Sequence, residues 1–381
     1  MFFHKQNKKP KIIFISHDSA RGGAPILLLN LLKWIKENSD LEFDIIIRKK
    51  GVLVDEFKKL GKTIFFPKKI NWIKRLKLKL YLKRQNIKLI FSNTGTNGKI
   101  QKFLSFLNCP QICYVQEREK LIEMFSATKF KVALKYTDKY LAASEAVRND
   151  LIKYYKIAKN KITTIHSFIK KPNSIPSNKE EIRKKLNISK DSLIIGGVGG
   201  VYWIKGVDLF IEMAKIIKEK FKKDVHFIWV GDLSNNPNKE QYLNSVKKAG
   251  LKDRFHFTEE VKNPLDYMNI FDVFVMCSRS EALGLVNLEA AFLKKPIVCF
   301  KDAGGPEEFV KDNAGFIVSY LDVEEMTKKI IELLKDKKLR DKLGFEAYRN
   351  LTQGFSIDTQ APKIIKEIKD YLSSCTNSKR V

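Results

Sequence analysis

Residues 276–310 read MCSRSEALGLVNLEAAFLKKPIVCFKDAGGPEEFV, and this stretch determines the fold that we expect. Its pattern indicates a strand, a loop, a helix beginning near Leu285, a second strand at 296–300 and a loop rich in glycine. Both strand segments are continuously apolar, as in strands covered by helices on both faces. A strand, a helix and a second strand in this order predict a parallel pair with a right-handed crossover.

The same alternation runs along the whole chain. Short β-branched or aromatic runs, with helical patterns between them, lie at residues 11–15, 43–47, 63–66, 88–91, 111–115, 139–143, 162–165, 193–198, 225–230, 255–257, 272–276, 296–300 and 315–318. These are too many strands for one compact open sheet, and a polar stretch with two prolines at 168–184 interrupts the series. We therefore expect an α/β protein with two doubly wound, Rossmann-like domains, 1–169 and 170–355. The segment 356–381 carries an apolar helical stripe, and we expect this helix to return to the first domain.

Charge is concentrated in the first half of the chain. The 381 residues include 72 Lys and Arg and 43 Asp and Glu, a net charge of +29. Residues 1–170 hold 36 basic and 13 acidic side chains, whereas residues 171–381 hold 36 and 30. The first half should therefore face an anionic partner. An apolar content of 44% excludes a disordered chain.

Neither targeting segments nor cysteine chemistry is expected. No apolar run approaches the ~20 residues of a membrane-spanning helix, and the charged start of the chain lacks the apolar segment of a signal peptide. The five cysteines have irregular spacings and no C-x-x-C pair. This pattern favours reduced, buried thiols in the cytoplasm over disulfides or a metal site.

The stretch 278–289 contains a pair of candidate carboxylates. The loop before Leu285 follows a strand, and ligands of open α/β sheets bind at the carboxyl ends of strands. The first N–H groups of the following helix suit a phosphate. Glu281 and Glu289 can accept hydrogen bonds from the hydroxyls of a polyol. Two solvated glutamates beside an ordinary crossover helix are the alternative.

Two further glycine loops follow predicted strands. In the first, Gly22 and Gly23 would let the backbone approach an anion closely. In the second, Lys205 places a positive charge beside the start of a helix, where a diphosphate could bind. Tight turns would also explain these glycines, since neither loop is a G-x-G-x-x-G or a P-loop motif.

Together these residues resemble the retaining, nucleotide-sugar-dependent glycosyltransferases of family 4. That family has the GT-B fold, in which two Rossmann-like domains face each other across a cleft. The matching segments are a glycine loop, an S-x-x-V segment, a K-G pair, the E-x7-E motif and a G-G-x-x-E loop, here Gly22 to Pro25, Ser144 to Val147, Lys205 and Gly206, Glu281 to Glu289, and Gly304 to Glu308. The resemblance implies transfer of a sugar from a nucleoside diphosphate with retention at the anomeric carbon, and no metal or other cofactor.

The resemblance also implies a role for each motif residue. Glu281 would face the donor sugar, and Glu289 would bind the ribose hydroxyls. The backbone after Gly284, with the N–H groups of Leu285 and Val286, would hold the diphosphate. Lys205 would neutralise the charge that develops on the leaving diphosphate. Gly22 and Gly23 would also contact the donor.

The chain departs from the family at two positions. Gly200 stands where many members have Arg, five residues before the lysine of the K-G pair. Gln116 stands where many have His, and Glu117 follows it. Gln116 can donate a hydrogen bond to a sugar hydroxyl but cannot take up a proton, so Gln116 and Glu117 are candidate sugar or acceptor contacts.

Residues 68–88 contain nine Lys or Arg and no acidic residue. Trp72, Ile73, Leu76 and Leu80 share one helical face, which suggests an interfacial helix on anionic lipid. A crossover helix with solvated lysines is the alternative. A lipid-linked acceptor at the membrane would explain the charge of the first domain.

We therefore expect a cytoplasmic enzyme at the inner face of the membrane that adds a sugar to a growing, lipid-linked surface glycan. Partners would be a nucleotide-sugar donor, a glycan or lipid-linked acceptor and an anionic membrane, but no nucleic acid. A nucleic-acid-binding protein is an alternative supported by charge alone, since no recognition motif is present. An inactive sugar-binding relative and a GT-B epimerase or phosphorylase are others. The base, the sugar and the acceptor stay open.

Overall fold

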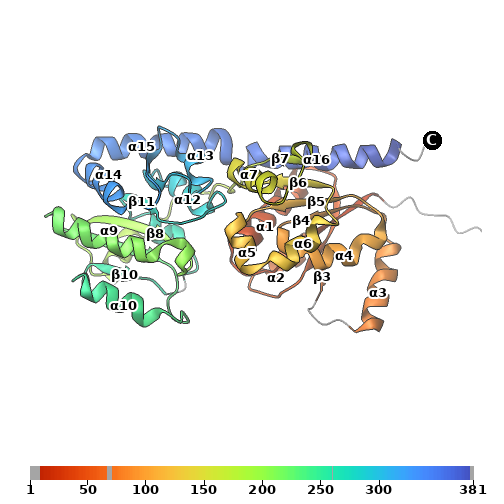
Figure 1. The fold of residues 1–381 in the computed structure, drawn as a ribbon, viewed down its shortest axis with the longest axis horizontal. Coiled ribbons are helices and arrows are strands. Elements are labelled where there is room, and N and C mark those ends of the chain that lie inside the picture. The colour runs from red at the N-terminus through yellow and green to blue at the C-terminus, as the bar shows by residue number, and fades with distance from the viewer. Residues whose placement is uncertain (1–8, 67–70, 260, 378–381) are drawn as a thin grey trace, which may run out of the picture. The chain divides into compact units, whose positions relative to one another are not determined.

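The computed structural model describes residues 9–66, 71–259 and 261–377 of the chain (Figure 1). They divide into two compact units. Unit 1 comprises Met1–Lys170 and Ile357–Val381, and unit 2 comprises Lys171–Ser356. Each unit contains one parallel sheet flanked by helices, so the prediction of two Rossmann-like α/β domains is confirmed.

Unit 1 has a seven-stranded sheet in the order β3-β2-β1-β4-β5-β6-β7. Its strands are β1 (Lys11–Ser16), β2 (Glu42–Ile47), β3 (Lys62–Phe65), β4 (Ile87–Ser92), β5 (Gln111–Val115), β6 (Lys139–Ala142) and β7 (Ile162–Thr164). Its helices are α1 (Gly23–Asn38), α2 (Val54–Leu60), α3 (Trp72–Lys83), α4 (Gly98–Leu104), α5 (Glu119–Phe125), α6 (Ala127–Leu134), α7 (Glu145–Lys153) and α16 (Ile357–Asn377).

Unit 2 has a six-stranded sheet in the order β10-β9-β8-β11-β12-β13. Its strands are β8 (Leu193–Val198), β9 (Val225–Val230), β10 (Phe255–Phe257), β11 (Val273–Met276), β12 (Ile297–Phe300) and β13 (Gly315–Val318). Its helices are α8 (Lys179–Lys185), α9 (Val207–Lys220), α10 (Lys239–Lys248), α11 (Pro264–Met268), α12 (Leu285–Phe292), α13 (Pro306–Val310), α14 (Val323–Lys335) and α15 (Lys337–Asn350).

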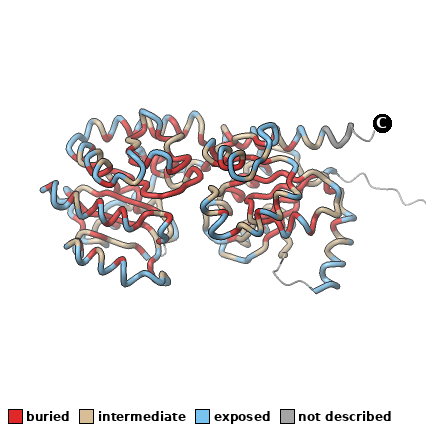
Figure 2. The backbone as a smooth tube through the Cα atoms, viewed as in Figure 1, coloured by how far each residue is buried: buried red, intermediate tan, exposed pale blue. Residues whose placement is uncertain are grey.

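The continuously apolar runs form strands because both of their faces are covered. Every residue of β9 is buried, and its Trp229 ring packs edge-on against Phe210 of α9, with ring centroids 5.3 Å apart. Figure 2 shows the strands of both units as buried tubes, with exposed residues along the outer sides of the helices. The buried apolar area supplies most of the stabilisation, at roughly 25 cal/mol per Å².

Each sheet reverses its strand order at one point. In unit 1, β1 lies between β2 and β4, and in unit 2, β8 lies between β9 and β11. Helices that follow strands on either side of such a point cover opposite faces, which leaves a crevice at the carboxyl ends of the two central strands. The glycine loops and the E-x7-E segment follow these strands.

Helix α16 belongs to unit 1 although it follows unit 2 in the sequence. It packs against α1 and β4, and the apolar residues that it buries are Ile357, Ala361, Ile364, Ile365 and Ile368. Its Glu367 accepts a hydrogen bond from the Thr163 hydroxyl of β7 at 2.7 Å. The core of unit 1 therefore contains residues from both ends of the described chain.

Candidate functional site

Lys205 and Glu281 form an ion pair at the strand-order reversal of unit 2. Lys205 ends the short 3-10 turn Trp203–Lys205 after β8, and Glu281 lies in the loop after β11. Their side chains are only 24% and 11% exposed. Because the two strands are neighbours, the fold brings together two residues that are far apart in the sequence.

The Glu281 backbone is also fixed. Its N–H donates to Ala303 at 2.8 Å, and its carbonyl accepts from the N–H of Gly305 at 3.1 Å. A Cβ on Gly305 would lie 2.0 Å from the carbonyl oxygen of Ala282, so only glycine permits this approach. The G-G-x-x-E loop therefore holds Glu281 through main-chain contacts.

The amino end of α12 is open to an anion. The helix begins at Leu285, as predicted, and Gly284 at its N-cap has φ +78° and no side-chain hydrogen bond to the helix. A Cβ on Gly284 would lie 3.1 Å from the Glu281 side chain. The first turn, with Leu285 and Val286, contains no acidic residue. Its N–H groups and the positive end of the helix dipole are available to a phosphate.

Glu289 lies four residues after Leu285, on the same side of α12. Its carboxyl is partly buried, and burial raises its pKa from 4.5 to about 7. Among the described residues, no hydrogen bond or ion pair to this carboxyl compensates for its desolvation. A carboxyl left in this way beside an open helix end can accept hydrogen bonds from a ligand.

The glycine loop of unit 1 leads into α1. Gly22 is the N-cap with extended backbone, and Gly23 is the first helical residue. As a glycine, Gly22 has no side chain to cap this end, and the first turn of α1 contains no acidic residue. The side chain of His17, just after β1, lies 3.3 Å from Asp18.

Gln116 uses its amide donors inside the protein. Its Nε2 donates to the backbone oxygen of Asn93 at 3.0 Å and to the side-chain oxygen of Asn93 at 2.9 Å. Asn93 in turn donates to the carbonyl of Ala24 at 2.7 Å. The expected donation from Gln116 to a sugar hydroxyl therefore competes with these bonds, which tie the ends of β4 and β5 to the glycine loop.

Glu117 accepts hydrogen bonds from the backbone. Its carboxyl receives the N–H of Gln116 at 3.0 Å and that of Gly95 at 3.4 Å. Burial raises the pKa of Glu117, although nearby His17 and these N–H groups lower it in part. The carboxyl thus organises the loops after β4 and β5.

Sequence reasoning brought Lys205, Glu281 and Glu289 to attention but missed the residues that hold them. Arg279 and Asp208 link the Lys205 and Glu281 loops of unit 2, and Asn93 links three loops of unit 1. Arg279 stands two residues before Glu281, in the same loop. Asn93 follows β4 directly, and a polar residue at that place was the available signal.

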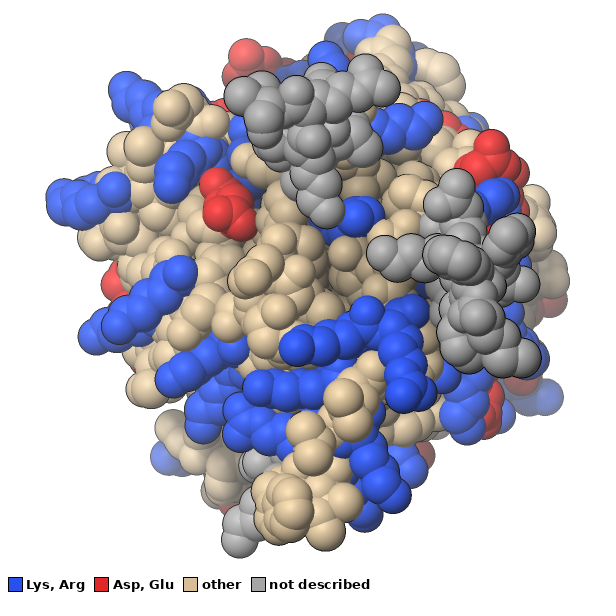
Figure 3. All heavy atoms as spheres, turned by 90° about the vertical axis from the view of Figure 1, so that its right-hand side faces the viewer, with Lys and Arg blue, Asp and Glu red and all other residues tan. Residues whose placement is uncertain are grey.

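Residues 72–83 of the basic stretch form α3, and residues 87 and 88 begin β4. Residues 68–70 lie outside the described residues. The helix has two apolar faces. Leu78, Tyr81 and Leu82 pack on the core of unit 1, whereas Trp72, Ile73, Leu76 and Leu80 are 46–73% exposed. Figure 3 views the side on which α3 lies and shows Lys and Arg side chains crowded together, with few Asp or Glu. Within the described residues, no helix is both long and apolar enough to span a membrane.

Solved structures of known proteins share the arrangement of these two sheets. The crystal structure of Anabaena Alr3699/HepE with UDP and glucose superposes on 94% of this chain and 99% of its own, with a TM-score of 0.81 and 19% identity. WaaG, a glycosyltransferase involved in lipopolysaccharide biosynthesis, superposes on 93% of this chain and 98% of its own, with a TM-score of 0.72 and 16% identity. The fold is therefore GT-B.

Comparison of the sequence with known families and proteins adds information about function. Residues 178–350 match the model of the family described as Glycosyl transferases group 1. The capsular polysaccharide biosynthesis glycosyltransferase CapM of Staphylococcus aureus is 25% identical over 297 residues, 74% of this chain and 76% of that protein. The N,N'-diacetylbacillosaminyl-diphospho-undecaprenol alpha-1,3-N-acetylgalactosaminyltransferase of Campylobacter jejuni is 27% identical over 62% of this chain and 61% of that protein. These matches support the group 1 family and a glycosyltransferase that builds glycans.

Proposed function

We propose that this protein is a retaining glycosyltransferase of family 4 that moves a sugar from a nucleoside diphosphate to a growing, lipid-linked surface glycan. The observation that carries the proposal is the Lys205–Glu281 ion pair at the strand-order reversal of unit 2. The pair stands next to the uncapped amino end of α12. This combination of a fixed cation, a carboxylate and free N–H groups suits a sugar joined to a diphosphate.

The chemistry follows from where charge develops. When the bond between the anomeric carbon and the diphosphate breaks, negative charge accumulates on the leaving phosphate. An ammonium group has three N–H donors, so Lys205 can hold Glu281 with one and the diphosphate with the others. The N–H groups of Leu285 and Val286 add the positive end of a helix dipole. We propose that these groups replace a divalent metal, so that chelator leaves the rate unchanged.

Glu289 fits the ribose of the donor. It follows Leu285 by one helical turn, so a nucleotide whose diphosphate lies at the helix end places its ribose along the same side of α12. A desolvated carboxyl without a protein partner gains hydrogen bonds when two adjacent hydroxyls arrive.

A panel of donors tests the proposal. Binding of UDP, GDP and ADP and their sugars is measured by calorimetry, and release of nucleoside diphosphate is followed with a lipid-linked glycan acceptor, with and without EDTA. We expect one nucleotide class to bind and the proton NMR spectrum of the product to show the anomeric configuration of the donor. Binding without turnover would identify an inactive relative, and an inverted product would refute the mechanism.

We further propose that α3 docks unit 1 on an anionic membrane at the inner face of the cell, where a lipid-linked acceptor is presented. The exposed residues Trp72, Ile73, Leu76 and Leu80 would enter the interface, while the lysines around them meet lipid phosphates. Each basic residue near such a surface contributes about 1 kcal/mol. The relative from Campylobacter, whose name specifies a diphospho-undecaprenol acceptor, supports a lipid-linked substrate.

The membrane test uses lysines that do not pack inside unit 1. Arg75 and Lys79 lie over the Phe103 ring and are therefore left unchanged. Lys74, Lys77 and Lys83 are exposed, and their joint change to Glu should abolish sedimentation with anionic vesicles. The matched control makes the same charge change in unit 2, at the exposed Lys247, Lys248 and Lys252.

Binding should weaken as salt rises, since screening acts over a Debye length of ~8–10 Å. The membrane role of α3 would be refuted if the α3 variant and the control bound equally, or if the parent bound neutral and anionic vesicles equally. In that case α3 is an ordinary crossover helix.

A further inference from the structure

Arg279 connects the two loops that carry the Lys205–Glu281 pair. Its side chain is only 8% exposed. Its backbone N–H donates to the carbonyl of Ile204 at 2.8 Å, and its backbone carbonyl accepts the Tyr320 hydroxyl at 2.9 Å. The main chain of the Glu281 loop is therefore anchored to the Lys205 loop at this residue.

The guanidinium makes the second connection. It donates to the carbonyl of Trp203 at 2.7 Å and binds both carboxylate oxygens of Asp208, at 2.8 and 2.6 Å. The Trp203 ring covers it, with 4.5 Å between the Arg279 Cζ and the ring centroid. The Asp208 hydrogen bonds raise the pKa of Arg279 further, so the group is a permanent cation in a planar, two-point clasp.

These contacts bracket Lys205. Trp203 lies two residues before it, and Asp208, in the first turn of α9, three residues after it. Between them, Gly206 has φ +72° and approaches Cys277 so closely that a Cβ would lie 2.0 Å from the Cys277 carbonyl oxygen. The turn that carries Lys205 is thus held at both ends by one side chain, which itself stands two residues from Glu281.

We propose that Arg279 is a positioning residue for the transfer reaction: it holds the Trp203–Lys205 turn so that the Lys205 ammonium stays on Glu281 and faces the departing diphosphate. The inference rests on the proposed function of Lys205. Arg279 acts through Lys205, because each of its described side-chain contacts falls on that turn or on Asp208. A shift of about 1 Å in a charged group at a reacting centre can reduce the rate 100-fold.

Arg279→Lys is the test, because lysine keeps the charge but cannot bind Asp208 and the Trp203 carbonyl in one plane. We expect kcat to fall 10- to 100-fold in the otherwise unchanged protein. In a Lys205→Ala background the same change should alter kcat less than twofold, because the group that it positions is already gone. A merely structural role would lower kcat by the same factor in both backgrounds, and that result would overturn the proposal.

Arg340→Lys is the matched control. Arg340 is another buried arginine of unit 2, which donates to the carbonyls of Leu333 and Leu334 at 2.7 and 3.0 Å and lies 3.5 Å from Asp272. Its change should lower Tm and leave kcat as it is. If Arg279→Lys does not fold, Asp208→Asn replaces it, since Asp208 is 44% exposed and its loss loosens the same clasp.

The outcomes separate the two proposals. If the parent protein transfers no sugar from any donor, the proposed function fails. If the parent is active and Arg279→Lys keeps its kcat, the proposed function stands and the positioning role is refuted.

Discussion

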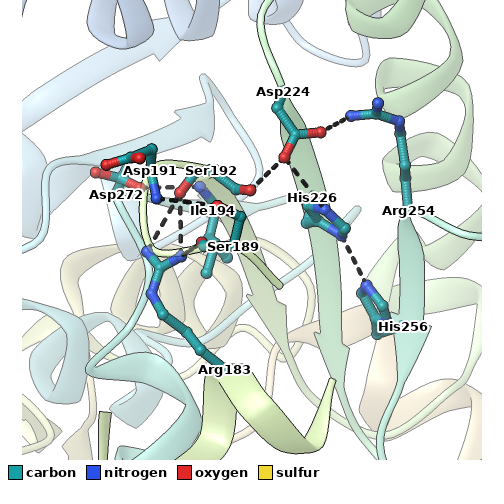
Figure 4. A network of polar contacts seen from close by, with 10 residues as sticks. All are labelled: Arg183, Ser189, Asp191, Ser192, Ile194, Asp224, His226, Arg254, His256 and Asp272. Carbon is teal, nitrogen blue, oxygen red and sulfur yellow. Dashed lines mark hydrogen bonds and ion pairs between the residues drawn. The ribbon is translucent and has the colours of Figure 1, made fainter. Parts of the chain in front are cut away.

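In unit 2, Asp224 and Arg254 at the amino ends of two strands form an ion pair, whereas near the carboxyl ends the Glu289 carboxyl has no hydrogen-bond or ion-pair partner among the described residues. Asp224, just before β9, binds Arg254 and Ser192, and its carboxylate lies 3.6 Å from His226 (Figure 4). Arg183 donates to the carbonyls of Ser189 and Ser192. These contacts tie the starts of neighbouring strands together.

The carboxyl ends of β8, β11 and β12 lead into glycine-containing loops, and their charged groups are used differently. Lys205 and Glu281 are paired, but no group in the described part of the chain compensates the desolvation of Glu289, and its pKa is raised to about 7. Burial also favours the neutral form of the amino-end histidines, but these two rings are partners of each other. His226 and His256 lie 3.0 Å apart, and burial lowers the pKa of His256 to about 4. The Asp224 carboxylate is thus used in contacts within the protein, whereas the Glu289 carboxyl is available to a ligand.

The largest effect on activity should come from the Lys205–Glu281 pair. We expect Lys205→Ala and Glu281→Gln each to lower kcat by about 10²- to 10³-fold, the magnitude typical of removing one preorganised charge from a transition state. Release of nucleoside diphosphate at saturating donor measures it. If either variant kept more than a third of the parent kcat, the residue changed in it would have no role in the reaction.

The second effect is on donor affinity. Glu289→Ala should weaken donor binding about 10- to 100-fold, because a hydrogen bond to a charged group is worth ~1.5–3 kcal/mol. Calorimetry with the matching nucleotide sugar gives the Kd, and thermal unfolding of the free variant serves as a folding control. If the donor Kd of this variant equalled that of the parent, Glu289 would not bind the ribose.

A third effect follows from the raised pKa of Glu289. Below about pH 7 the carboxyl of the free enzyme is protonated, and above it the carboxylate is ready to accept hydroxyl protons. Donor binding should therefore strengthen about tenfold between pH 6 and pH 8. In Glu289→Gln this pH dependence should disappear. Persistence of the slope in that variant would mean that another group titrates.

The smallest effect on activity is expected at the amino ends. Asp224→Asn removes an acceptor for Arg254, Ser192 and His226, and should lower the free energy of unfolding by about 1 kcal/mol, since the carboxylate is partly exposed. The kcat and the donor Kd of the folded variant should match those of the parent. If turnover fell without a loss of stability, the amino ends of the strands would also take part in the reaction, and the proposed difference between the two ends would be wrong.

Local sequence patterns predict the strands, whereas contacts between residues far apart in the chain could not be predicted. All thirteen β-branched or aromatic runs become strands, because a parallel strand covered on both faces consists mostly of apolar residues. The alternation of strands and helices predicts that the glycine loops after β8 and β11 follow strands of one parallel sheet, and these two strands are neighbours in it. The Arg279–Asp208 clasp joins residues 71 apart in the chain, and no local pattern encodes such a pairing. Likewise, the hydrogen bonds from Gln116 to Asn93 depend on the packing of two strand ends, so no local pattern predicts them.

Helix α16 has a consequence for biosynthesis. The core of unit 1 includes Ile364, Ile365 and Ile368, which the ribosome adds only after the whole of unit 2. Throughout translation of residues 171–356, the surface of α1 and β4 that α16 covers has no partner within the nascent chain. Unit 2 is contiguous and can fold first, although it is made second. The nascent amino-terminal half must therefore await the last helix, and a chain that stops before it leaves apolar surface open to chaperones and to aggregation.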